Sequence, residues 1–333
     1  MDWVRRLISI LDNRHVRALL APVQRPLLVM SCKVMLFNAR VLARHSSGPE
    51  EYEALDYFLN GIFETMSDME LHSEALKCAE GLIEIDPADG ANYYNRAQAL
   101  YSLERYDDAV VSCEKGIEID PASDASCLSW YLKGLALENL YRADEALASY
   151  EKALEMNPYY VEVWDARGGL LDEMGRLDEA LECFDAAIGI NPGYPRTWYS
   201  KGFALAQLHR EEEAIRAYDE SIKIDPFDTY AWLQRAHSLE DVGRYEEALN
   251  SYDAAITINI ESSASWQDKA GLLFELGREA EAEECLEKAV SLEMRCLDEI
   301  LWEDARVEAS WAAVARRLLR PLIDLFTRRS PSV

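Results

Sequence analysis

The chain of 333 residues has no long apolar run. Its most apolar stretch, "PLLVMSCKVMLF" at residues 26–37, contains Lys33 and is far shorter than the roughly 20 apolar residues that a membrane-spanning helix needs. Near the N-terminus, Arg14, His15 and Arg17 interrupt the apolar core that a signal peptide requires. We therefore expect a cytoplasmic protein with no transmembrane helix.

Paired cysteines and metal-ligand spacings are also missing. The seven cysteines are scattered and form no C-x-x-C pair, and the five histidines show no H-x-x-x-H spacing. An odd, scattered set of cysteines is typical of free thiols in a reducing compartment, whereas zinc sites are built from closely spaced Cys and His. The sequence thus predicts neither a disulfide framework nor a metal site.

Enzyme motifs are absent as well. The chain contains no G-x-x-x-x-G-K-[ST], no G-x-G-x-x-G after a strand, no G-x-S-x-G and no EF-hand loop. We therefore expect a non-enzymatic protein, with no catalytic residues and no cofactor.

Basic residues are fewer than acidic residues, and they are unevenly distributed along the chain. The chain holds 34 Lys and Arg against 61 Asp and Glu, a net charge of −27. Residues 1–48 nevertheless carry +6 and residues 310–333 carry +4, which leaves −37 on residues 49–309. Sequence-independent binding to nucleic acid depends on Lys and Arg, so an acidic body argues against it.

What the sequence does contain is an internal repeat. The phrase "ERYDDAV" at 104–110 returns as "YRADEAL", "GRLDEAL", "HREEEAI", "GRYEEAL" and "GREAEAE". Its alanine recurs at intervals of 37, 34, 34, 34 and 34 residues, at Ala109, Ala146, Ala180, Ala214, Ala248 and Ala282. An aromatic residue keeps the same step, at Tyr93, Trp130, Trp164, Trp198, Trp232 and Trp266, and Ala or Gly follows four residues after each.

This pattern has a direct physical meaning. A bulky aromatic and a small residue four positions apart lie on one helix face, where the small residue lets another helix approach closely. Glycines such as Gly175 end the first helix of a repeat, and prolines such as Pro192 stop the second. These residues resemble the tetratricopeptide repeat, a 34-residue helix–turn–helix. The resemblance implies an all-α, right-handed α-solenoid.

The predicted array covers residues 56–296. It begins with a degenerate repeat at 56–89 and continues with repeats at 90–123, 127–160, 161–194, 195–228, 229–262 and 263–296, with residues 124–126 as an insertion. Terminal repeats cannot bury their outer faces alone and need caps. We expect capping helices at 297–327, followed by a tail at 328–333, and a basic amphipathic helical segment at 1–50.

Charged residues that recur in every repeat are interpreted as structural and not as parts of a functional site. In "GRLDEALECFD", residues 175–185, four carboxylates surround Cys183, but every repeat has equivalents, and a catalytic pair would be expected only once. We interpret them as a solvated helix face and Cys183 as a structural thiol. Two rows of basic residues are expected to pair with neighbouring carboxylates: Arg96, Lys133, Arg167, Lys201, Arg235 and Lys269, and Arg105, Arg142, Arg176, Arg210, Arg244 and Arg278.

The resemblance also implies a concave groove, lined by the first helices of successive repeats, that holds a segment of a partner protein. Carried over by register, the candidate lining residues are Tyr94, Gln98, Tyr101, Tyr131, Glu138, Asn139, Glu162, Asp165, Asp172, Glu173, Arg196, Tyr199, Phe203, Tyr230, His237, Glu240, Asp241, Gln267, Phe274 and Glu275. Aromatic residues at a surface are common anchors of interfaces. Any single tyrosine of this row can instead pack between adjacent first helices, and that alternative stays open here.

The sequence therefore predicts a protein–protein interaction scaffold whose acidic, aromatic groove binds a neutral-to-basic, amphipathic peptide or helix, and no nucleic acid. Two alternatives concern the basic residues 1–48: they dock in the groove of their own chain, or they anchor the protein at an anionic membrane surface.

Overall fold

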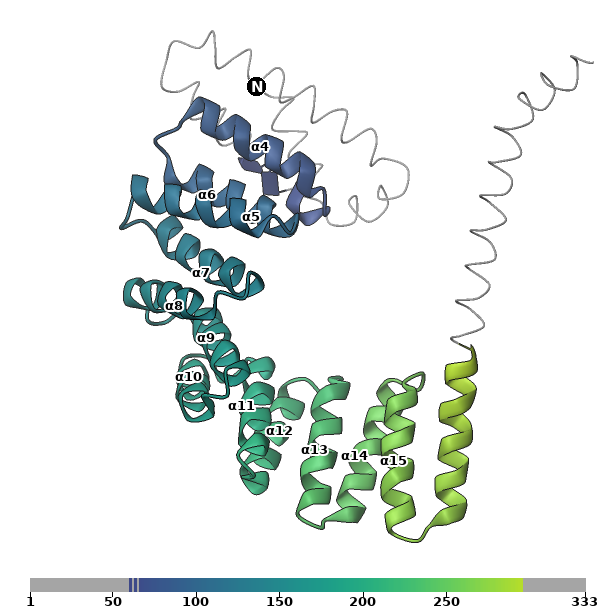
Figure 1. The fold of residues 1–333 in the computed structure, drawn as a ribbon. Coiled ribbons are helices and arrows are strands. Elements are labelled where there is room, and N and C mark those ends of the chain that lie inside the picture. Colours follow the sequence, from purple (N-terminus) through teal and green to yellow (C-terminus); the bar gives the residue numbers. More distant parts are fainter. Residues whose placement is uncertain (1–59, 62, 65, 296–333) are drawn as a thin grey trace, which may run out of the picture. The chain divides into compact units, whose positions relative to one another are not determined.

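The computed structural model describes residues 60–61, 63–64 and 66–295, and within them every regular element is a helix (Figure 1). The all-α class is thereby confirmed. The predicted N-terminal segment at 1–50, the capping helices at 297–327 and the tail at 328–333 lie outside the described residues.

The helices alternate as the repeat predicts. The first helices are α5 (Gly90–Ser102), α7 (Asp124–Asn139), α9 (Val161–Glu173), α11 (Pro195–Gln207), α13 (Thr229–Asp241) and α15 (Ser263–Glu275). The second helices are α4 (His72–Ile85), α6 (Tyr106–Ile119), α8 (Ala143–Met156), α10 (Leu177–Ile190), α12 (Glu211–Ile224), α14 (Tyr245–Ile258) and a last helix at 279–295. Each first helix packs against the second helix of its own repeat.

Two compact units divide between Pro192 and Gly193. The N-terminal unit contains α4–α10, and the C-terminal unit contains α11–α15 and helix 279–295.

The predicted insertion at 124–126 is part of a helix. It forms the first turn of α7, which is therefore longer than its counterparts. The side chain of Ser123 accepts a hydrogen bond from the backbone N–H of Ser126, and this N-cap satisfies a donor that a helix start otherwise leaves unpaired.

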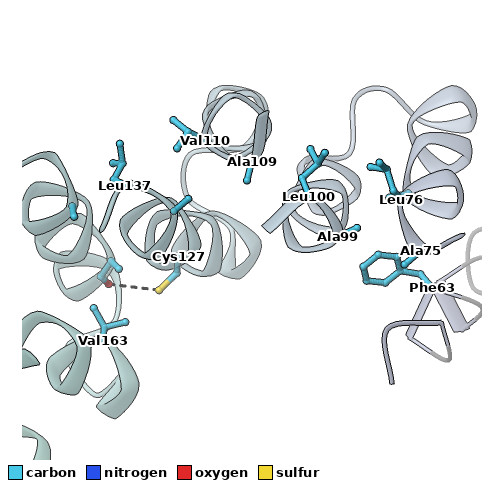
Figure 2. Close-up of a cluster of buried hydrophobic side chains, with 14 of the residues drawn as sticks. Phe63, Ala75, Leu76, Ala99, Leu100, Ala109, Val110, Cys127, Leu137 and Val163 are labelled. Carbon is cyan, nitrogen blue, oxygen red and sulfur yellow. Dashed lines mark hydrogen bonds between the residues drawn. The ribbon is translucent and has the colours of Figure 1, made fainter. Parts of the chain in front are cut away.

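Within a repeat, the small residue of the first helix faces the ring of the second. A Cβ atom added to Gly134 would lie 2.3 Å from the ring of Tyr150, and one added to Gly202 would lie 2.6 Å from Tyr218. The core of the N-terminal unit is rich in alanine and leucine and begins at Phe63 (Figure 2). The Sγ of Cys127 donates to the carbonyl of Ala153 there, at 3.5 Å.

The turn between the two helices requires a left-handed residue. Gly175, Gly243 and Gly277 take φ values of 73°, 76° and 73°, and non-glycine residues such as Glu104 and Tyr141 adopt 59° and 58° at the same place in other repeats. Glycine adopts this conformation without the steric cost that Cβ imposes. The predicted helix end at these glycines is confirmed.

The repeated tryptophans are half-buried, and Trp164, Trp232 and Trp266 also serve as hydrogen-bond donors. The indole N–H of Trp164 donates to the carbonyl of Pro158 at 2.9 Å, and that of Trp232 to Pro226 at 3.1 Å. Where the proline is lost, Trp266 still donates to the carbonyl of Ile260 at 3.2 Å. Each such bond fastens the loop between two repeats to the first helix that follows it.

Candidate functional site

The first-helix residues of the N-terminal unit are engaged with one another. Asn139 on α7 donates to the hydroxyl of Tyr101 on α5 at 3.2 Å, and to the carbonyl of Leu135 at 2.9 Å. Tyr101 also packs edge-on against Tyr106, with ring centroids 5.4 Å apart. These contacts join two successive first helices and engage the amide nitrogen of Asn139 and the hydroxyl of Tyr101 within the fold.

Tyr131 and Glu138 on α7 are structural in the same way. The ring of Tyr131 lies 6.1 Å from that of Tyr150 and 5.3 Å from that of Tyr160, so this tyrosine packs between repeats. Glu138 accepts a hydrogen bond from the hydroxyl of Tyr150 at 2.8 Å. Burial, followed by the charge of Glu138, raises the pKa of Tyr150.

The other candidates of the N-terminal unit vary in exposure. Tyr94 packs against the cluster of Ala97, Cys113 and Leu132, and burial raises its pKa. Asp165 is only 5% exposed and offers little surface to a partner. Gln98 and Asp172 are half-buried, and Glu162 and Glu173 are exposed.

The C-terminal unit presents aromatic rings to solvent. Tyr199 and Phe203 stack on α11 with centroids 6.5 Å apart, and Tyr199 also lies 6.0 Å from the buried ring of Tyr218. Phe203 is 38% exposed, Tyr230 on α13 is 71% exposed and Phe274 on α15 is 44% exposed. Such large exposed rings mark a surface suited to association.

His237 joins α13 to α15 within this unit. Its Nε2 lies 3.6 Å from Oδ2 of Asp268, and its ring lies 5.7 Å from that of Tyr252 in an edge-on arrangement. The hydrogen bond that His237 donates to the carboxylate of Asp268 raises the pKa of His237, and the nearby carboxylates of Glu240 and Asp241 act in the same direction against partial burial.

Glu240 adds a constrained carboxylate beside this histidine. The hydroxyl of Tyr252 donates to Glu240, while burial raises the pKa of the carboxyl group. Its Oε1 is buried without a hydrogen-bond partner. Together with Asp241, Asp268 and Glu275, it gives the surface a concentrated negative charge.

The remaining candidates of this unit lie on the exposed side of their helices. Gln267 on α15 donates to Oε1 of Glu293 at 2.6 Å, which joins α15 to helix 279–295. Arg196, Asp241 and Glu275 are exposed. Register alone missed Asp268, which stands two residues after Trp266. The other repeats have uncharged residues at this position, such as Asn95 and Gln234.

The second basic row pairs with carboxylates as predicted, and the first row does so in part, because Arg96 donates to the hydroxyl of Ser112 and Arg167 to the thiol of Cys183. From the first row, Lys133 binds Glu114 at 2.8 Å and Arg235 binds Asp219 at 2.7 Å, and both cations also lie over the tryptophan of their own helix. The second row makes i,i+3 pairs at the start of each second helix: Arg105–Asp108, Arg142–Glu145, Arg176–Glu179, Arg210–Glu213, Arg244–Glu247 and Arg278–Glu281. Each of these exposed pairs contributes little to stability, because solvent and salt screen the two charges, so their role is local.

The four carboxylates within residues 178–185 are exposed, and Cys183 is buried beside Arg167, whose Nη1 lies 3.3 Å from Sγ. Burial raises the pKa of this thiol. Among the described residues there is no group of three potential metal ligands, and no helix has the length and apolarity to cross a bilayer.

Comparison with known proteins agrees with this architecture. Tetratricopeptide repeat models match residues 92–123, 129–160, 166–229 and 233–294, which together exceed half of the chain. A search of curated proteins finds no match.

Two solved structures share the fold at low sequence identity. The C-terminal part of a TPR repeat-containing protein from Cytophaga hutchinsonii matches with a TM-score of 0.59 and 16% identity, over 71% of this chain and 95% of its own. The pilF protein of Pseudomonas aeruginosa matches with a TM-score of 0.53 and 19% identity, over 67% of this chain and 98% of its own. By its repeats, its helix pairs and these matches, the chain belongs to the tetratricopeptide repeat family.

Proposed function

We propose that the protein is a non-enzymatic protein–protein interaction scaffold, and that the first-helix surface of its C-terminal unit binds a neutral-to-basic, amphipathic segment of a partner. This surface, called the C-terminal face, comprises Phe203 on α11, Tyr230, His237, Glu240 and Asp241 on α13, and Asp268, Phe274 and Glu275 on α15. The observation that carries the proposal is the exposure of its aromatic rings beside these carboxylates.

The contrast with the N-terminal unit supports this choice. There, Tyr101, Asn139, Tyr131 and Glu138 use their polar atoms and rings on neighbours within the fold. On the C-terminal face, Tyr230 and Phe274 remain exposed. Burying such rings against a partner removes apolar surface from water, which is the main driving force for association.

The charge of this unit indicates the chemistry of the partner. Residues 193–295 hold 21 acidic and 11 basic side chains, a net charge of −10. Several of the basic ones, including Arg235, Lys269 and Arg278, are in ion pairs within the unit. A segment with Lys or Arg beside apolar side chains complements both the carboxylates and the rings.

A direct test uses two labelled helical peptides of equal length and equal leucine content, one with Lys and one with Glu on the polar face. Fluorescence anisotropy with the full chain should show binding of the Lys peptide only. Phe274→Ala and Tyr230→Ala should each weaken it by about tenfold or more, which corresponds to about 1.4 kcal/mol.

Phe227→Ala is the matched control, because this exposed phenylalanine lies in the loop before α13, outside the C-terminal face. Equal loss in all three variants would mean that binding is not specific to the C-terminal face, and no loss in any would mean that the peptide adheres to the acidic surface by charge alone. Either result would contradict the proposal.

The alternatives for residues 1–48 lie outside the described residues and stay predictions, as does a cytoplasmic location. If this basic segment occupies the C-terminal face, deleting it should raise the affinity of the Lys peptide. If it instead anchors the protein at lipid, the deletion should abolish flotation with anionic liposomes and leave peptide affinity unchanged.

A further inference from the structure

The last described helix, 279–295, exposes an apolar face whose counterparts in the preceding repeats are buried. Val290 is 56% exposed, whereas the equivalent Ile256 on α14 is 6% exposed and Ile222 on α12 is 9% exposed. Leu286 is 36% exposed, whereas Tyr252 and Tyr218 at its position are buried. In those repeats the next first helix follows in the chain and packs onto the unit, as α13 does after α12 and α15 after α14.

The sequence beyond residue 295 contains a matching element. Every first helix has its aromatic residue, then a small residue four positions later and a leucine seven positions later, as in Trp266, Ala270 and Leu273. Trp311, Ala315 and Leu318 repeat this spacing. α15 runs from three residues before its tryptophan to nine after it, so the same frame covers residues 308–320. Pro321 follows at once, and proline cannot continue a helix.

Two charged residues break the pattern together. Position 283 is apolar in the earlier repeats, as at Leu249, but here it is Glu283. The position six after the tryptophan is apolar or small in the earlier repeats, as at Leu272, but in the segment 308–320 it is Arg317. Leu249 and Leu272 belong to one buried cluster. Glu283 and Arg317 have opposite charges, so they can form an ion pair at the place where the earlier repeats have two apolar side chains in contact.

We infer that residues 308–320 dock on the exposed Leu286–Val290 face of helix 279–295 as an additional first helix that closes the array, with Arg317 paired to Glu283. The connection at 296–307 is twelve residues long. A chain of that length reaches up to about 40 Å when extended, ample for a return beside the preceding helix. This inference concerns the end of the array and is independent of the proposed function.

The docked helix would also extend the first-helix surface. By register, Arg316 corresponds to His237 and Arg320 to Asp241. The acidic C-terminal face would therefore be bounded by two arginines at its end, and a bound segment would meet basic residues there.

A disulfide tests the docking geometry. In the N-terminal unit, a Cβ on Gly116 of α6 would lie 3.7 Å from Oγ of Ser129 on α7, and the equivalent positions are Ala289 and Ser310. In the full chain carrying Cys296→Ser, the pair Ala289→Cys and Ser310→Cys should oxidise to an intramolecular bond, identified by peptide mapping. Each single-cysteine variant serves as the control. A cross-link between two copies would mean that a second chain covers the face and would overturn the inference, as would the absence of a cross-link.

Charge exchange provides a test that does not depend on cysteine. Glu283→Arg or Arg317→Glu alone should speed amide hydrogen exchange in residues 308–320 by about tenfold or more, and the double exchange should restore protection. Glu284→Arg and Arg316→Glu, one position away on each helix, should have no such effect. Failure of the double variant to restore protection would contradict the pairing.

Discussion

Gly168 of α9 lies directly against the ring of Phe184 on α10. A Cβ atom at residue 168 would be 2.6 Å from Cε1 of that ring, closer than atoms can approach without a shift. The adjacent Gly169 has no atom within 4 Å of its own Cβ position. Two neighbouring glycines of one helix thus have opposite environments.

We expect Gly168→Ala to lower the free energy of unfolding by about 1–3 kcal/mol, because overpacking exceeds the gain in helix propensity. Gly169→Ala should raise it by up to about 1 kcal/mol. Urea denaturation of the two variants measures both. Adding Phe184→Leu to Gly168→Ala should recover part of the loss, and equal effects of the two alanines would refute the packing argument.

Tyr141 occupies the left-handed turn position with φ of 58° and is almost fully exposed. Replacing it with glycine removes the steric cost of Cβ without losing buried contacts. We expect Tyr141→Gly to stabilise the protein by up to about 1 kcal/mol, and Gly175→Ala, where φ is 73°, to destabilise it by about the same amount. Thermal unfolding curves would show opposite shifts in midpoint, and shifts of the same sign would contradict this account.

The indole of Trp164 fastens the loop before α9 through its hydrogen bond to Pro158. Trp164→Phe keeps a ring and removes the donor, so it should cost about 1 kcal/mol of stability and speed hydrogen exchange in the loop at 157–160. Trp130 provides the control, because the residue six positions before it, Asp124, is already within α7 and no equivalent bond forms there. A comparable cost for Trp130→Phe would assign the effect to packing alone.

The sequence predicted the repeats well because the same contacts recur every 34 residues. Residues such as Ala109, Gly175 and Pro192 therefore reappear at fixed positions of the repeat, each with its own structural role. Side chains on the first-helix surface were harder to place, because their partners come from the next repeat. Asp165 shares its register position with the half-buried Tyr199 yet is buried, and Tyr131 packs against Tyr160 across a repeat boundary. Asp268 meets His237 only because α13 and α15 lie next to each other.

The contact between His237 and Asp268 predicts a pH dependence. The pKa of His237 is raised in the folded protein, chiefly by the hydrogen bond to Asp268 and despite partial burial. The folded state therefore binds more protons than the unfolded state. Its contribution to stability is fully present below about pH 6.5, the unfolded value, and is lost as the pH rises through the folded pKa.

Glu240 acts in the same direction at lower pH, because burial raises the pKa of its carboxyl group. Its contribution is fully present below about pH 4.5 and is lost as the pH rises through its folded pKa. In the window between pH 6 and 8, the histidine's share is therefore the part of the pH dependence that His237→Asn removes. Because His237 and Asp268 are both partly exposed, we expect a loss of only a few tenths of a kcal/mol across this window.

Urea titrations at pH 6 and pH 8 measure this difference, and NMR titration of the His237 ring follows its ionisation directly. His237→Asn should flatten the dependence, and Asp268→Asn should reduce it while lowering the pKa of His237. A free energy of unfolding that rises between pH 6 and 8 in the unmodified protein, and falls when His237 is replaced, would show that burial of the ring outweighs its carboxylate partner.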